Sequence, residues 1–229
     1  MMRFRRTCGV ALIAVFALAD TSCMPQLFGC KPQKIDAAAA PDSFVVAFET
    51  SRGRFDVMAR KPWAPLGVAH FYALVQDKHY DDNRFFRVVK GFVAQFGLSG
   101  DPKINSALDN QCFADEPVQH SNTRGTIAYA RGGPNTRSAQ LFVNLVDNPK
   151  LDTLSTFGFP PFGEVITGMP VVDSLYSGYG EAAPRGGSEY GMEGPSQDSI
   201  RIKGNAYLTA GWPKLDYIKT ARVVQEWRR

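Results

Sequence analysis

Short runs of alternating apolar and polar residues recur along most of this sequence, and they constrain its fold more than any other feature. The first two runs are SFVVAFET (43–50) and RFDVMA (54–59), which a turn at Gly53 joins. Later apolar runs of strand length occupy residues 84–97, 125–130, 139–146, 161–166 and 217–224. An alternation with period two is typical of a strand with one buried face, so these runs predict a mainly β domain.

Helical patterns are few and lie far apart. Pro65 is suited to the first turn of a helix, and an apolar face with helical spacing follows it. This face consists of Val68, Phe71, Tyr72 and Val75. A second short helix is predicted over 168–178, and a helical stretch over 205–212 follows a glycine-rich loop. Many strands with two isolated helices favour a closed antiparallel barrel with two capping helices over alternating βαβ units.

The N-terminal residues have the pattern of an export signal. Three arginines, Arg3, Arg5 and Arg6, precede an apolar run over 8–19. The run is shorter than the roughly 20 residues that span a bilayer, so a signal peptide over 1–22 is favoured over a transmembrane helix. The protein is therefore expected in a bacterial cell envelope, in the periplasm or anchored by a lipid, rather than freely secreted.

Two ways of processing this signal stay open. Residues 17–19 (Ala-Leu-Ala) offer a cleavage site for plain secretion, whereas Cys23 is suited to accept the lipid of a bacterial lipoprotein signal. Cys23 is preferred as the lipid acceptor over Cys30, which lies far from the apolar run. If Cys23 is lipidated, Cys30 and Cys112 are left to pair, although nothing in their spacing argues for a disulfide.

Composition and motifs exclude several classes of function. Residues 23–42 show no apolar period and predict a flexible tether, which precedes a domain over 43–229. The net charge is only +4, and no basic run lies in that domain, which argues against nucleic-acid binding. Its three histidines lack metal-ligand spacing, and no P-loop, dinucleotide fingerprint or G-x-S-x-G motif is present. The sequence therefore predicts neither a metal nor a cofactor, and contact with a membrane only through an N-terminal lipid.

One cation occupies an unusual place. Arg87 lies in RFFRVV (84–89), a segment otherwise suited to a hydrophobic core. A guanidinium stays charged at ordinary pH and does not enter an apolar layer unpaired. Arg87 therefore either points to water from a strand or faces an apolar pocket. Its odd position matches those of Val93 and Gln95, so the three share one face if the bend at Gly91 keeps the register.

Three segments resemble the motifs of the cyclophilins, the barrel-shaped peptidyl-prolyl cis/trans isomerases. They are FFRVVKGFVAQFG (85–97), GTIAYARGGPNTRSAQLFVNL (125–145) and PFGEVITGMPVVD (161–173). The motifs occur in the order and spacing of the family, and the resemblance runs from about Phe44 to Val224. It implies an eight-stranded barrel that acts on proline-containing polypeptides without a cofactor, as an expected monomer. The C-terminal part resembles a bacterial branch of the family.

The resemblance also assigns the site residues. Arg87 aligns with the catalytic arginine, and Gln95 would orient either that arginine or the substrate carbonyl. Ala130 and Arg131 would present their backbone to the peptide, with Gln140 beside them. The residues expected to line or border the proline pocket are Phe92, Val93, Phe142, Leu151 and Phe159. Departures from the family occur at Phe86, Arg131 and Lys150, where it carries His, Asn and, in many eukaryotic members, Trp.

The implied chemistry suits a site that has no nucleophile. Rotation about a prolyl bond breaks amide resonance against a barrier of about 18–20 kcal/mol and makes no new bond. A donor fixed near the proline nitrogen binds the twisted amide better than either planar isomer. We expect an isomerase that assists the folding of exported proteins, with Arg87 as that donor. The alternative is a weakly active proline-peptide binding module or holdase with the same fold.

Overall fold

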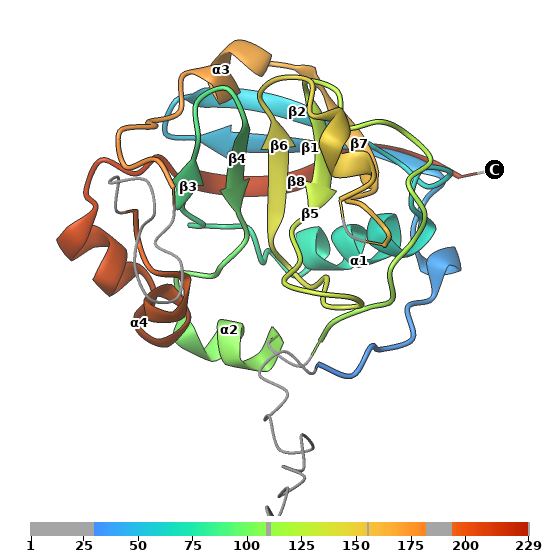
Figure 1. Ribbon diagram of the computed structural model, residues 1–229, viewed down its shortest axis with the longest axis horizontal. Helices are drawn as coiled ribbons and strands as arrows, with labels where there is room; N and C mark the ends of the chain where they lie inside the picture. The colour runs from blue at the N-terminus through green and yellow to red at the C-terminus, as the bar shows by residue number, and fades with distance from the viewer. Residues whose placement is uncertain (1–29, 109–110, 155, 182–193, 229) are drawn as a thin grey trace, which may run out of the picture.

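The structure is a computed structural model that describes residues 30–108, 111–154, 156–181 and 194–228 (Figure 1). All strand pairs in it are antiparallel, and they form one sheet in the order β3-β4-β6-β5-β7-β2-β1-β8. The strands are β1 (Ser43–Thr50), β2 (Gly53–Arg60), β3 (Arg87–Val88), β4 (Val93–Phe96), β5 (Thr126–Tyr129), β6 (Leu141–Asn144), β7 (Pro161–Thr167) and β8 (Ile218–Trp227). The mainly β class and the strands predicted from alternation are confirmed.

The sheet curls into a half-barrel whose two ends meet at a single point. The end strands are β3 and β8, and an isolated bridge pairs Arg84 with Tyr217 just before these strands begin. Next to it the amide of Phe85 donates to the carbonyl of Asp216 at 2.9 Å. Because β3 has only 2 residues, the end strands pair with each other in the described residues only through this bridge. The fully closed barrel expected from the sequence is not confirmed.

Aromatic side chains fill the inside of the curled sheet. Phe48 on β1 stacks on Phe55 of β2, with ring centroids 4.9 Å apart. The helix α1 (Pro65–Gln76) lies across one end of the sheet (Figure 1). Of the face predicted for it, Val68, Phe71 and Val75 are buried and Tyr72 is half-buried. At the opposite end α3 (Met169–Asp173) forms a second, shorter cap than the sequence predicts. The turn after it begins at Ser174, whose amide donates to the carbonyl of Pro170.

Two further helices form a layer outside the sheet, beside β3 and β4 (Figure 1). The first, α2 (Pro102–Leu108), is not predicted by the sequence, and the second, α4 (Gln197–Gly211), begins earlier than predicted. A kink at Gly204, with φ +57°, divides α4. A separate apolar cluster buries Phe86 against this layer, together with Leu98, Ile200, Leu208 and Leu215. The family's histidine position is thus a packing residue here.

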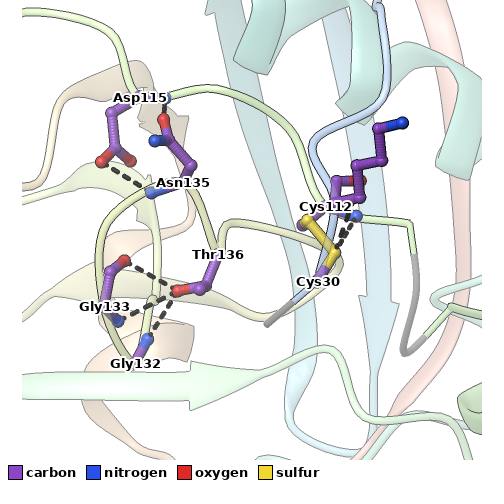
Figure 2. Close-up of a disulfide and its surroundings, with 8 residues drawn as sticks. Cys30, Cys112, Asp115, Gly132, Gly133, Asn135 and Thr136 are labelled. Carbon is purple, nitrogen blue, oxygen red and sulfur yellow. Dashed lines mark hydrogen bonds between the residues drawn. A yellow bond between two sulfur atoms is a disulfide. The ribbon is translucent and has the colours of Figure 1, made fainter. Parts of the chain in front are cut away.

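The residues before β1 correct the predicted tether. The sequence assigns 23–42 to a flexible segment, yet residues 30–42 pack on the domain. Gln33 donates its amide to the carbonyl of Cys112 at 2.7 Å, and Ala40 is 2% exposed in the core. A disulfide joins Cys30 to Cys112 with their Cα atoms 6.0 Å apart (Figure 2). Contacts with residues far away in sequence hold residues 30–42 in place. No local sequence pattern therefore predicts that this stretch is ordered.

We expect loss of the Cys30–Cys112 disulfide to lower the free energy of unfolding by about 2–4 kcal/mol, because the bridge restricts the unfolded chain. The two cysteines are 82 residues apart in sequence, so the closed loop is long. Denaturant unfolding of the oxidised protein, the reduced protein and a double serine variant measures the effect. Identical midpoints for all three would contradict a bridge in the folded protein.

A buried histidine predicts loss of stability in acid. His70 on α1 lies in the core, where burial lowers its pKa from 6.5 to about 4. Between these values the unfolded chain binds a proton that the folded protein does not, so stability falls as the pH falls through this window. We expect His70 to contribute a loss of about 2 kcal/mol between pH 7 and pH 5. Burial lowers the pKa of His79 as well, so replacing His70 by Phe should remove the share of His70 and leave that of His79 in denaturant titrations. An unchanged pH dependence would contradict this prediction.

The predicted signal peptide and Cys23 lie outside the described residues. Across the four described ranges, no helix is both long and apolar enough to cross a membrane.

Candidate active site

The β3–β4 hairpin places a cation and an amide side by side. Gly91, with φ +75°, forms the turn, and the ladder pairs Arg87 directly with Gln95. Terminal nitrogen Nη1 of Arg87 donates to Oε1 of Gln95 at 3.1 Å, and Nε2 of Gln95 donates to Oε1 of Gln140 at 2.8 Å. The prediction that Arg87 and Gln95 share a face is confirmed. The hydrogen bonds form a chain from the guanidinium to Gln140, the residue before β6.

An apolar cluster lies next to this chain, on the face of the sheet opposite the core. Val93 on β4, Phe142 on β6 and Leu151 on η2 (Pro149–Asp152) are 2%, 5% and 6% exposed. Ala128 on β5 completes its floor, and sequence reasoning missed this residue. Phe92, Ala130 and Phe159 pack at its edge, half-buried. Strand alternation explains the cluster, because the neighbours of Phe142 along β6 point into the core instead.

Aromatic rings connect the cluster to the cation. The Cζ atom of Arg87 lies 5.5 Å from the ring centroid of Phe92, within the range of a cation–π contact. On the other side, the rings of Phe142 and Phe159 meet edge to face at 5.8 Å. The structure thus brings together Arg87, Gln95 and Gln140 with every residue expected in the proline pocket. A charged donor beside a small apolar surface is the arrangement that the sequence implied.

Arg131 does not extend toward this surface. Its side chain is 3% exposed and pairs with Asp115 at 3.1 Å, and its Cζ atom lies 5.2 Å from the ring centroid of Phe159. The guanidinium thus contacts the ring of Phe159 at the edge of the cluster. The peptide-binding role of the backbone at Ala130 and Arg131 stays a prediction. The amide of Ala130 already donates to the carbonyl of Gln140 at 2.9 Å.

An open pocket of about 170 Å³ adjoins the apolar cluster and shares Phe159 with it. Its other lining residues are Arg131, Gly132, Gly133 and Leu154. The hydroxyl of Thr136 accepts the amides of Gly132 at 3.1 Å and Gly133 at 3.0 Å, which fixes the loop (Figure 2). The sequence did not predict this second pocket.

Asp115 connects that loop to the disulfide. It accepts the amide of Asn135 at 2.9 Å, while Asn135 accepts the amide of Asp115 at 2.8 Å (Figure 2). Cys112 lies three positions earlier in the same segment, where the bridge to Cys30 holds it. The disulfide therefore anchors the segment that shapes one wall of the site.

Sequence reasoning missed one charged contact of the cation. Glu181, from the glycine-rich loop after α3, accepts the Nε and Nη2 hydrogens of Arg87, the latter at 2.7 Å. The two residues are 94 positions apart, so no local pattern relates them. In the part of the chain that the structure describes, no group of three His, Cys, Asp or Glu residues is placed to hold a metal ion. The site combines hydrogen-bonding side chains with an apolar surface.

Comparison with known proteins agrees with this geometry. The family description "Cyclophilin type peptidyl-prolyl cis-trans isomerase/CLD" matches residues 45–203, and the chain therefore belongs to the cyclophilin family. It is an isomerase of the peptidyl-prolyl cis-trans class.

Curated relatives and solved structures give the degree of similarity. Peptidyl-prolyl cis-trans isomerase B of Escherichia coli is 32% identical over 162 residues, which cover 68% of this chain and 95% of the relative. Isomerase A of Dickeya dadantii is 35% identical over 145 residues, 61% of this chain and 74% of the relative. A crystal structure of a cyclophilin-type isomerase from Cryptosporidium parvum has a TM-score of 0.55 at 19% identity, covering 80% of this chain and 99% of that one. A second structure of it was determined in the presence of the dipeptide Ala-Pro.

Proposed function

We propose that this isomerase catalyses prolyl rotation through Arg87, which donates a hydrogen bond to the proline nitrogen of the twisted amide. The observation that supports this is the position of the guanidinium at the edge of the apolar cluster, 5.5 Å from the ring centroid of Phe92. A guanidinium has five N–H groups, and three of them donate to Gln95 and Glu181. The other two have no acceptor among the described residues and are available to a substrate.

The geometry favours the transition state over the ground state. The apolar cluster of Phe92, Phe142 and Leu151 accepts the proline ring of either isomer by burying apolar area. Such binding is nearly uniform along the reaction and lowers KM rather than the barrier. The nitrogen gains a lone pair only when the amide twists, so a donor directed at it acts mainly on the transition state. The catalytic part of the binding energy therefore comes from Arg87.

A panel of short X-Pro peptides tests this function. Uncatalysed cis/trans exchange takes tens to hundreds of seconds. The purified protein should make this exchange much faster. Saturable peptide binding without acceleration would instead support the alternative, a proline-peptide binding module or holdase.

We further propose that the protein acts on exported polypeptides in a bacterial cell envelope. The N-terminal pattern over 1–22 supports export, and so does the Cys30–Cys112 disulfide, because such bonds persist in oxidising compartments. The sulfur of Cys30 is occupied in this bond, which leaves Cys23 as the candidate acceptor for a lipid. Detergent partitioning and the mass of the mature protein test this proposal. A mature chain that begins at Asp20 without a lipid would mean plain secretion.

A further inference from the structure

We propose that Glu181 is a positioning residue for Arg87, and this inference rests on the catalytic role proposed for that arginine. The carboxylate of Glu181 accepts the Nε and Nη2 hydrogens of Arg87 with separate oxygen atoms. This is a bidentate arrangement, in which two parallel hydrogen bonds fix the plane of the guanidinium as well as its location. A single hydrogen bond fixes a location but leaves the plane free to turn.

The other contacts of Arg87 do not hold that plane. Gln95 accepts one hydrogen from Nη1 at 3.1 Å, and the ring of Phe92 lies 5.5 Å from Cζ. Without Glu181, the long side chain of Arg87 keeps much of its rotamer freedom. A donor that acts at a transition state must already point at the reacting atom before the reaction begins. Glu181 supplies this orientation along the edge of the guanidinium that contains Nε.

Glu181 is itself held in place. Its carbonyl accepts the amide of Gly194 at 2.9 Å, which ties Glu181 to the segment that leads into α4. Just before it, the amide of Gly180 donates to the carbonyl of Ser177 at 3.0 Å. The side chains of Arg87 and Glu181 are 19% and 30% exposed, so the ion pair is partly shielded from water. A fixed and partly shielded carboxylate is suited to orient a catalytic group.

Steady-state isomerisation kinetics with separate kcat and KM values test the role of Glu181. We expect Glu181→Ala to lower kcat about tenfold, because the guanidinium is no longer oriented, with KM changed less than about twofold. The conservative variant Glu181→Gln should recover part of the loss, since its amide oxygen still accepts one guanidinium hydrogen. Adding Glu181→Ala to Arg87→Ala should cause no further loss, because Glu181 acts only through Arg87.

A matched control lies on strands that contain no site residue. Glu164 on β7 accepts the Nε and Nη2 hydrogens of Arg60 on β2, and these side chains are 35% and 39% exposed. Both hydrogen bonds go to Oε1 of Glu164. Glu164→Ala removes an arginine–glutamate ion pair away from the site and should leave kcat unchanged.

The outcomes separate this inference from the proposed function. Unchanged or increased kcat in Glu181→Ala, with Arg87→Ala strongly impaired, would overturn the positioning role and leave the role of Arg87 intact. An equal further loss from Glu181→Ala in the absence of Arg87 would also overturn it. Failure of the proposed function has a different signature, namely equal turnover by the wild type and Arg87→Ala.

Discussion

Replacing Arg87 by alanine is expected to lower kcat/KM for a short X-Pro peptide by about 10²–10³-fold, the usual cost of removing one donor directed at a transition state. The guanidinium contributes little to the fold, because it lies outside the hydrophobic core and its partners are the polar side chains of Gln95 and Glu181. The apolar cluster beside it keeps its own contacts in the variant. Turnover should therefore fall much more than stability.

The measurement is the catalysed exchange rate, taken together with the thermal midpoint of the same sample. Arg60→Ala is the matched control, because Arg60 also pairs with a glutamate through Nε and Nη2 but lies away from the apolar cluster. We expect this control to retain wild-type turnover. If Arg87→Ala retained full turnover, the catalytic assignment would be wrong, and if it unfolded, Arg87 would be a structural residue.

Replacing Glu116 by alanine is expected to lower the free energy of unfolding by about 3–5 kcal/mol, because it removes the nearer of the two carboxylates that pair with a buried cation and leaves two backbone donors unpaired. Nη1 of Arg137 donates to Glu116 at 3.1 Å, and the side chain of Arg137 is 0% exposed. The same carboxylate accepts the amides of Leu66 at 2.6 Å and Gly67 at 3.0 Å in the first turn of α1. One substitution thus breaks an ion pair and exposes two unsatisfied donors.

Denaturant unfolding measures this loss of stability, and two further variants serve as comparisons. Glu116→Gln should be less destabilising, because its amide oxygen still accepts hydrogen bonds. Glu49→Ala is the surface control, since Glu49 and Arg54 are both 48% exposed and 3.8 Å apart, and it should change stability by at most about 1 kcal/mol. A similar, small effect of Glu116→Ala would show that Asp115, which lies 3.6 Å from Nε of Arg137, is a sufficient partner for this cation.

The strands and α1 were predictable because their signal is local. Period-two alternation marks β1 and β2, and the face of α1 repeats every 3.6 residues. The first half of α4 lacks such a signal, since its stability comes from burying Ile200 against Phe86, a residue far away in sequence. The ordering of residues 30–42 likewise depends on pairing with the segment around Cys112. Long-range contacts of this kind leave no local pattern.

The features of the candidate site also fall into those that local sequence predicts and those that depend on long-range contacts. Strand register predicts that Arg87 and Gln95 face the same side, and the family motif locates the apolar cluster. The contact between Glu181 and Arg87 was not predictable, because it joins a glycine-rich loop to a distant strand. The inward direction of Arg131 depends on Asp115, whose pairing no motif specifies. The sequence thus predicts which residues form the site, but not the carboxylates, Glu181 and Asp115, that pair with its two arginines.

The central claim is that Arg87 acts on the twisted amide rather than on the bound peptide. Nuclear magnetic resonance exchange measurements on one X-Pro peptide give both the dissociation constant and the isomerisation rate on the enzyme. We predict that Arg87→Ala leaves the dissociation constant within about threefold of wild type while the on-enzyme rate falls about 10²-fold or more. A variant that binds the peptide much more weakly but isomerises the bound peptide at the wild-type rate would contradict the claim.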